Sequence, residues 1–159
     1  TSDAQVMKDI HAAIAWARAN GGDIKRLGVT GFCWGGRITW LASQQVQSVK
    51  AGVAWYGRLV GDKTAMTPSH PIDGVAQQKA PVLGLYGAAD TGIPLETVRQ
   101  MQDALAQQKN NGAAQASRFE IYPDAPHAFH ADYRPSYREA VAKDAWSKCV
   151  AWFKQQGVV

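Results

Sequence analysis

Three residues whose types suit nucleophilic catalysis occur along the chain in the order cysteine, aspartate, histidine: Cys33, Asp90 and His127. A thiol is a poor nucleophile until a nearby base or cation favours its thiolate. A histidine can accept the proton and later give one to a leaving group, and a carboxylate can fix the imidazole tautomer and stabilise the imidazolium. Long stretches of chain separate the three residues, so they can act together only if the fold brings them to one place.

The residues around Cys33 predict how its sulfur is presented. The motif Gly31-Phe32-Cys33-Trp34-Gly35-Gly36 follows the apolar run Leu27–Thr30 and precedes an amphipathic stretch. A strand, Gly-x-nucleophile-x-Gly and a helix form the nucleophile elbow of α/β-hydrolases, here with cysteine in the usual place of serine. We expect strained dihedrals at Cys33, and no room for side chains at Gly31 and Gly35. The sulfur then lies at a helix N-terminus, which favours a thiolate.

Hydrophobic periodicity predicts strands that alternate with helices. The predicted strands are Leu27–Thr30, Val49–Trp55, Pro81–Tyr86 and Arg118–Tyr122. The first predicted helix is capped by Ser2 and Gln5 and ends at Asn20, and the last is capped by Ser136 and Glu139. Between them, helices are predicted over about Trp34–Gln45 and from Pro94 to Gly112, with one helical turn near Ile72–Gln78. One face of the first helix is predicted to hold Val6, Ile10, Ala13, Ile14 and Ala17. The inner face of the last helix is predicted to hold Ala142, Ala145, Trp146, Cys149 and Phe153.

This alternation predicts an α/β fold with three layers, in which helices cover both faces of a mostly parallel sheet. Ligands of such sheets bind at the carboxyl ends of the strands. Three loops are predicted at that edge: Gly31–Gly36, Gly87–Pro94 and Pro123–Pro135. Each loop carries one member of the cysteine, aspartate and histidine set, so we expect the three side chains to meet there.

Composition narrows the possible partners and location. The 159 residues carry a formal charge of +4, but the Lys and Arg residues are scattered, which argues against a nucleic-acid surface. No apolar stretch is long enough to cross a membrane, so no membrane partner is expected. Cys33 and Cys149 lie in an elbow and on an apolar helix face rather than in a disulfide framework. This pattern predicts a reducing compartment such as the cytoplasm.

Three segments together resemble one enzyme family, the dienelactone hydrolases or carboxymethylenebutenolidases. They are Gly31-Phe32-Cys33-Trp34-Gly35-Gly36, Tyr86-Gly87-Ala88-Ala89-Asp90, and Tyr122-Pro123 with Pro126-His127-Ala128-Phe129. The resemblance implies that Cys33 is the nucleophile, Asp90 the acid and His127 the base. It also implies a small lactone or activated ester as substrate, an acyl-thioester intermediate, a cytosolic location and no cofactor.

The resemblance further implies that residues 1–159 are the C-terminal part of a single α/β-hydrolase domain. The first strands of the sheet, a second oxyanion donor and a substrate-binding arginine would then lie outside this chain. A second family arginine falls at Ala131, and Arg134 and Arg138 are the nearest substitutes, although both also suit a solvated surface. The strand Leu27–Thr30 is predicted to be an open edge, through which two copies of the chain can associate.

Residues around the elbow are candidates for contact with a substrate. The backbone N–H of Trp34 is the predicted oxyanion donor. Tyr56, Arg58 and Phe129 are predicted to bind substrate, and Trp34 and Tyr86 are further candidates for the pocket wall. Ordinary core packing is an alternative role for each of these side chains.

Three other functions are alternatives to hydrolysis. The glycines of the elbow resemble a dinucleotide-binding turn, but bulky Phe32 and Trp34 oppose close approach of a pyrophosphate, and no acidic residue follows the next strand. A metal site at His127 and His130 lacks the helical spacing that fixes geometry; His130 is expected at a pocket rim or on the surface. A non-catalytic binding module of the same fold is the third alternative.

Overall fold

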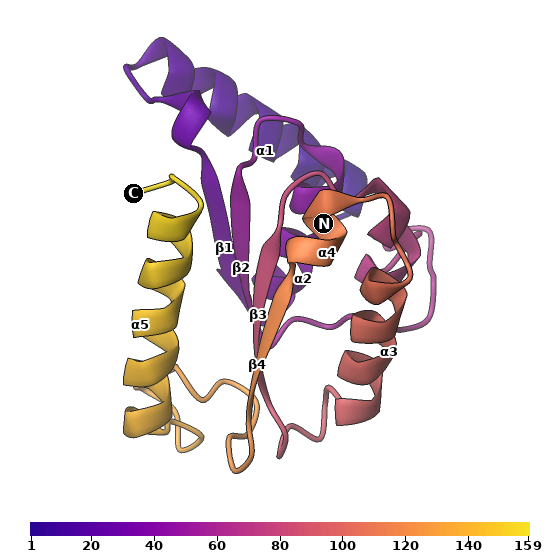
Figure 1. The fold of residues 1–159 in the computed structure, drawn as a ribbon, viewed down its shortest axis with the longest axis vertical. Helices are drawn as coiled ribbons and strands as arrows, with labels where there is room; N and C mark the ends of the chain where they lie inside the picture. The colour runs from indigo at the N-terminus through magenta and orange to yellow at the C-terminus, as the bar shows by residue number, and fades with distance from the viewer.

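A computed structural model describes all residues, 1–159, and contains one sheet of four parallel strands. The strands are β1 (Gly28–Phe32), β2 (Ala51–Trp55), β3 (Val82–Gly87) and β4 (Arg118–Tyr122). They lie side by side in chain order, β1-β2-β3-β4, so each connection crosses to the adjacent strand (Figure 1). Crossovers between adjacent parallel strands place the carboxyl ends of all four strands at one edge.

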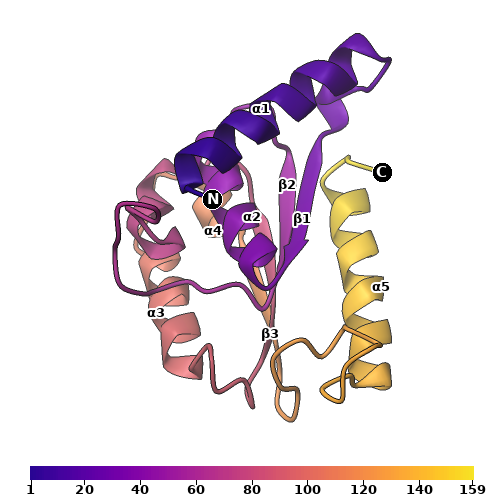
Figure 2. The ribbon, with the colours of Figure 1, turned by 180° about the vertical axis from the view of Figure 1, so that it is seen from behind.

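Helices cover the two faces of the sheet unequally. The α-helices are α1 (Asp3–Ala19), α2 (Trp34–Gln45), α3 (Leu95–Ala106), α4 (Gly112–Ala116) and α5 (Glu139–Gln155), and the 3₁₀-helices are η1 (Ile24–Arg26) and η2 (Pro71–Gln77). The C-terminal helix α5 lies alone on one face, and the helices α1 to α4 lie on the other (Figures 1 and 2). The predicted three-layer α/β architecture is confirmed.

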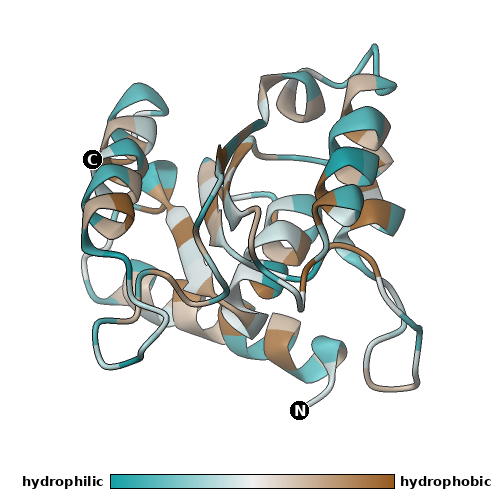
Figure 3. Ribbon diagram, turned by 90° about the horizontal axis from the view of Figure 1, so that it is seen from below, coloured by the Kyte–Doolittle hydropathy of each residue, from teal (hydrophilic) through white to brown (hydrophobic).

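The main core lies between the sheet and the helices on both faces. Strands β2 and β3 are buried throughout, as expected for central parallel strands. The largest fully buried side chains of the main core are Trp40, Trp55, Tyr56, Tyr86 and Phe129. A smaller cluster, which includes Met7, Ile38 and Leu41, joins α1 to α2. Hydrophobic and hydrophilic residues are mixed along the helices, as the colours in Figure 3 show.

Strand β1 is an open edge of the sheet, as the sequence predicts. It pairs only with β2, and its residues Thr30 and Phe32 are exposed. The neighbouring helix α1 is also poorly covered, with only Asp3 and Met7 buried. Of the five residues predicted to share one face of this helix, Ala13 is exposed and the other four are partly buried.

Two predicted helix boundaries differ in the structure. Ser2 does cap α1, accepting from the Gln5 backbone N–H at 3.2 Å. The second capping box does not form: the hydroxyl of Ser136 donates to the carbonyl of Ala128, and Arg138 is the residue before α5. Gly112 begins the short helix α4 rather than ending α3, because Asn111 caps the Ala114 N–H. No helix has the length and apolar character needed to cross a bilayer.

Candidate active site

The turn from β1 into α2 holds Cys33 in an unfavourable backbone conformation. Its φ is 55°, in the region that favours glycine, and its N–H donates to the carbonyl of Trp55 at 3.0 Å. Such a conformation persists only when surrounding contacts enforce it. The strain expected at Cys33 is therefore present, at the point where β1 meets the N-terminus of α2.

The glycines of the turn do not all serve the role predicted from the sequence. A Cβ at Gly31 would collide with the backbone of Gly35, as expected. A Cβ at Gly35 itself would meet nothing within 4 Å, so the prediction for that position is wrong. Gly36 is the second crowded position, because its Cβ would lie 2.5 Å from the carbonyl oxygen of Trp55. The position in α2 that has no room for a side chain is therefore Gly36 rather than Gly35.

The three candidate catalytic side chains lie in one hydrogen-bonded row. The Nδ1 of His127 is 2.6 Å from the Oδ2 of Asp90, and its Nε2 is 3.1 Å from the Sγ of Cys33. The carboxylate is buried, and its Oδ1 accepts from the N–H groups of Gly92 and Ile93 at 2.8 and 3.0 Å. These two bonds leave Oδ2 aimed at the imidazole. An ionised Asp90 accepts only, so Nδ1 carries the proton and Nε2 is free to accept from the thiol.

The thiol of Cys33 is harder to ionise than a free cysteine. Partial burial raises its pKa, the nearby Arg134 guanidinium lowers it, and the Asp90 carboxylate raises it. The net direction is upward, because the effect of burial on the pKa outweighs that of the Arg134 charge. The raised pKa fits a thiol that loses its proton during the reaction better than a preformed thiolate.

Two cavities meet at Cys33. The aromatic cavity, about 650 Å³, lies against Phe32, Tyr133 and Trp146. The polar cavity, about 560 Å³, lies against Arg58, Thr64 and His70. Both volumes fall in the range of small-molecule sites, and both lie at the carboxyl ends of the strands, where the topology predicts a ligand.

The predicted substrate-contact residues divide between cavity walls and core. Tyr56 lines both cavities, and Trp34 and Arg58 line the polar cavity. Phe129 is fully buried and lines neither cavity, which fits its alternative role in core packing. Tyr86 is likewise a core residue: its hydroxyl donates to the Gly57 carbonyl at 2.8 Å and accepts from the Trp40 indole. Both rings are covered by the elements that pack over the sheet.

Some cavity residues were missed or misplaced by sequence analysis. Trp146 was predicted to face the core, but it is 51% exposed and lies beside His130 on the wall of the aromatic cavity. His130 also packs against Trp55 at 4.6 Å between ring centroids, and burial lowers its pKa. Helical periodicity places Trp146 near the sheet side of α5, but it does not show that the sheet surface there is open.

The two arginines after His127 have different surroundings. Arg134 lines the aromatic cavity, and its charge acts on Cys33. The guanidinium of Arg138 donates instead to the carbonyls of Pro135 and Tyr137 and lines neither cavity. Of the two candidates, only Arg134 is placed to influence the site.

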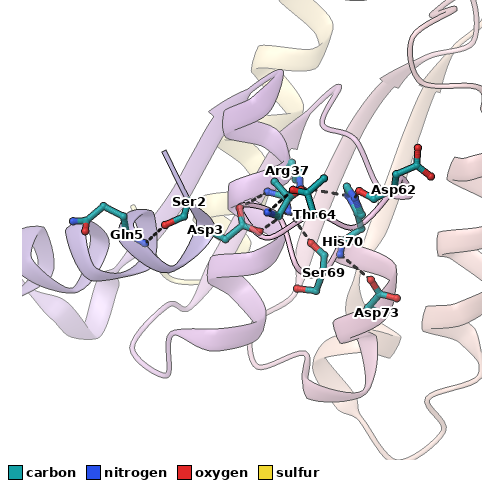
Figure 4. Close-up of polar contacts among 10 residues, drawn as sticks. Ser2, Asp3, Gln5, Arg37, Asp62, Thr64, Ser69, His70 and Asp73 are labelled. Carbon is teal, nitrogen blue, oxygen red and sulfur yellow. Dashed lines mark hydrogen bonds and ion pairs between the residues drawn. The ribbon is translucent and has the colours of Figure 1, made fainter.

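A buried ion pair joins three segments behind the polar cavity (Figure 4). Arg37, four residues after Cys33, donates to both carboxylate oxygens of Asp3, each at 2.7 Å. It also donates to the carbonyl of Ser69 at 2.7 Å, and its Nε lies 3.5 Å from Nδ1 of His70. His70 in turn is 2.9 Å from the Asp62 carbonyl. These contacts hold the irregular connection before η2 against α1 and α2. The sequence gives no signal for them.

Histidine and acidic side chains do not gather into a metal-binding group. No group of three or more His, Cys, Asp or Glu side chains is arranged so that it could hold a metal ion. His127 contacts Asp90 and Cys33, whereas His130 lies among aromatic rings.

Comparison with known proteins agrees with this geometry. The model of the "Dienelactone hydrolase family" matches residues 1–157, nearly the whole chain. The chain belongs to the dienelactone hydrolase family. The resemblance carried by the three motifs is therefore confirmed.

Two curated relatives of the dienelactone hydrolase family are identical to this chain at more than half of the aligned residues. A protein of Methylorubrum extorquens named "Putative carboxymethylenebutenolidase" is 56% identical over 157 residues, which are 98% of this chain and 52% of the relative. A protein of the same name from Salmonella typhimurium is 52% identical, covering 98% of this chain and 56% of the relative. The chain thus spans about half the length of the curated relatives it matches.

Solved structures show the same relationship. A crystal structure described as a "Putative Dienelactone Hydrolase", from Klebsiella pneumoniae, superposes with a TM-score of 0.91 at 51% identity, covering 97% of this chain and 62% of that one. An esterase of Pyrococcus furiosus superposes with a TM-score of 0.70 at 19% identity, covering 95% of this chain and 61% of that one. The second likeness supports the α/β-hydrolase fold alone.

Proposed function

We propose that this dienelactone hydrolase family member cleaves lactones or activated carboxylic esters through a Cys33–His127–Asp90 triad and an acyl-thioester. One observation carries the proposal: the imidazole of His127 contacts both the thiol and the buried carboxylate. Nucleophile and base within hydrogen-bond reach, with the base oriented by a third group, is the arrangement that activates a weak nucleophile.

In the first half-reaction the Sγ of Cys33 attacks the carbonyl carbon while Nε2 of His127 takes the thiol proton. The carbonyl π electrons move to oxygen, and the N–H of Trp34, the first residue of α2, faces the oxyanion. The tetrahedral intermediate collapses, the bond to the alcohol oxygen breaks, and His127 returns the proton to that oxygen. The products are a thioester on Cys33 and a free alcohol, or an opened ring when the substrate is a lactone.

In the second half-reaction His127 takes a proton from water, and the hydroxide formed attacks the thioester carbon. Collapse of the second tetrahedral intermediate breaks the C–S bond, and the sulfur takes the proton held by the imidazolium. The carboxylic acid leaves and the resting thiol is restored. Asp90, anchored by the Gly92 and Ile93 amides, keeps Nδ1 protonated and stabilises the imidazolium in both halves.

We also propose that residues 1–159 form the C-terminal part of a larger single domain. The open edge of β1 and the shorter length of this chain relative to its relatives support this proposal. A segment beyond this chain would then supply the second oxyanion donor. Since the loss of one such donor lowers kcat by roughly 10²–10³, the 159 residues alone are expected to be a weak catalyst. The two free cysteines support a cytoplasmic location.

The proposed function is tested by substituting the two reacting groups in the full-length protein. Cys33→Ala, Cys33→Ser and His127→Ala are compared with the unaltered protein on a lactone and on an aryl ester. We expect losses on the order of 10³-fold or more for Cys33→Ala and His127→Ala. Equal activity of all four proteins would rule out the mechanism. Replacement of the core residue Cys149 by Ser is the matched control and is expected to retain turnover.

A further inference from the structure

The two cavities at the active site share only two residues, Cys33 and Tyr56. The reacting sulfur therefore lies where two separate spaces meet. The first tetrahedral intermediate joins the sulfur to a carbon that carries both the acyl chain and the alcohol oxygen, so each of these two groups must occupy some space beside the sulfur. The arrangement raises the question of which part of the substrate enters which cavity.

The chemistry of the two walls is different. Nine of the 13 residues around the aromatic cavity are hydrophobic, with the aromatic rings of Phe32, Tyr133, Tyr137 and Trp146 among them. Only four of the 12 residues around the polar cavity are hydrophobic, and Arg58, Thr64, Thr67 and His70 contribute polar groups. An apolar group gains most by entering the first cavity, and a hydroxylated or charged group is better accommodated in the second.

The position of the general acid decides the orientation. His127 lines the polar cavity and does not line the aromatic one. The departing alcohol oxygen must lie within hydrogen-bond reach of Nε2 to receive its proton. The alcohol portion is therefore on the polar side of the sulfur. The acyl chain, which leaves the carbonyl carbon in another direction, is on the aromatic side.

We propose that the aromatic cavity binds the acyl portion of the substrate and the polar cavity binds its alcohol portion. The substrate class is then esters, or lactones of corresponding polarity, that join an aromatic or bulky apolar acyl group to a polar alcohol. This inference rests on the proposed hydrolase function and adds the identity of the residues that select each half of the substrate.

The aromatic wall is well suited to selection among acyl groups. Phe32 stacks on Trp55 with ring centroids 5.0 Å apart, and Trp55 stacks on Trp146 at 6.3 Å, so the exposed rings rest on a buried one. Tyr56, which contributes to both cavities, is fixed edge-on against His127 at 5.1 Å. These packed rings offer a preformed surface. Each methylene that an acyl chain buries there is worth roughly a fourfold increase in binding.

Two ester series in the full-length protein test the assignment. In the acyl series the alcohol is constant and the acid is acetate, butyrate or phenylacetate. In the alcohol series the acid is constant and the alcohol is either butanol or glycerol. The readouts are two ratios of kcat/KM: phenylacetate to acetate, and glyceryl to butyl.

The variants Trp146→Ala and Tyr133→Ala remove rings from the aromatic cavity, and Arg58→Met removes a charge from the polar one. Trp16→Ala is the matched control, because Trp16 is exposed and lines neither cavity. We expect both aromatic variants to lower the acyl ratio, by roughly tenfold for Trp146→Ala, with the alcohol ratio unchanged. Arg58→Met is expected to lower the alcohol ratio alone, and Trp16→Ala to change neither.

The assignment is overturned if the aromatic variants change the alcohol ratio instead, if Arg58→Met changes the acyl ratio instead, or if neither ratio moves. The Tyr133 variant keeps the test valid if Trp146→Ala fails to fold, because Tyr133 is 79% exposed. Failure of the hydrolase proposal is recognised separately: Cys33→Ala would then retain turnover. If Cys33→Ala is inactive but the aromatic variants change the alcohol ratio and Arg58→Met changes the acyl ratio, the mechanism stands and only the orientation is wrong.

Discussion

The Nε2 of His127 lies 3.1 Å from the Sγ of Cys33, although 94 positions of the sequence separate the two residues. The contact depends on two segments at the same edge of the sheet, the turn from β1 into α2 and the loop after β4. Cys33 is held at positive φ where β1 enters α2, and His127 follows β4 in a loop where Ala128 also has positive φ. A thiol with a raised pKa in contact with an imidazole is the basis of the first prediction below.

The charge of Arg134 is predicted to set the pH at which Cys33 reacts. The rate of Cys33 alkylation by iodoacetamide should rise with pH. Because burial raises the pKa of this thiol, the midpoint of that rise should lie at a higher pH than for a free cysteine. Arg134 opposes that increase, so Arg134→Met should move the midpoint to still higher pH. Quenching the alkylation at several times, followed by peptide mapping, measures the alkylation rate of each cysteine separately.

Arg138→Met is the control for this experiment, since Arg138 contacts only backbone carbonyls nearby. Its midpoint should match that of the unaltered chain. Cys149, which is buried and has its pKa raised to about 11, should remain unlabelled in the native protein. A midpoint below that of a free thiol, or an equal shift in both arginine variants, would contradict this account.

Adjacent glycines of the elbow are predicted to respond oppositely to the same change. Gly36→Ala forces a Cβ against the carbonyl of Trp55 and should destabilise the chain by about 1–3 kcal/mol. Gly35→Ala meets no atom and replaces a helical glycine, so it should be neutral or stabilising by up to about 1 kcal/mol. Urea unfolding of the two variants gives the comparison, and similar losses at both positions would show that the packing of α2 is described wrongly.

The Arg37–Asp3 pair is predicted to be a strong determinant of stability. Both side chains are buried, with residue exposures of 3% and 7%, so removing one leaves the other without its partner. Arg37→Met should therefore cost about 3–5 kcal/mol of unfolding free energy. Lys143→Met breaks the fully exposed pair with Glu139 and should have no measurable effect. Equal stability of these two variants would mean that the buried pair contributes little.

Hydrogen exchange is predicted to distinguish the two sides of β1. The N–H of Cys33 donates to Trp55 of β2, and strand amides alternate in direction, so those of Thr30 and Phe32 face the open edge. These two amides should exchange much faster than that of Val53 in the interior strand β2. Slow exchange at Thr30 and Phe32 in the monomeric 159-residue chain would show that another segment covers the edge.

Sequence patterns predicted the elements well where the local signal was strong. The bounds of α2 and β4 match those expected, and β1, β2 and β3 differ by no more than two residues at either end. Alternating strands and helices then required that the loops bearing Cys33, Asp90 and His127 reach the same edge, because crossovers between parallel strands leave no other arrangement. Topology, rather than any direct signal of contact, made the meeting of these side chains predictable.

The predictions that failed depend on packing between distant segments. Gly35 and Gly36 look alike in the sequence, and only the approach of α2 to Trp55 separates them. Phe129 and Trp146 are both aromatic, yet one is buried by surrounding elements and the other lies beside an uncovered part of the sheet. Ser136 suits a helix cap but bonds to Ala128 because the loop folds back before α5 begins. Such outcomes follow from three-dimensional contacts that local patterns do not encode.

The most direct test of the central claim is to trap the acyl group. The full-length protein is mixed with an activated ester, quenched in acid within the first turnover and digested for mass spectrometry. We predict an acyl group on the peptide containing Cys33, lost over time in the unaltered protein and retained in His127→Ala after slow acylation. Steady hydrolysis with no acyl group on that peptide, or with the acyl group on another residue, would contradict the account.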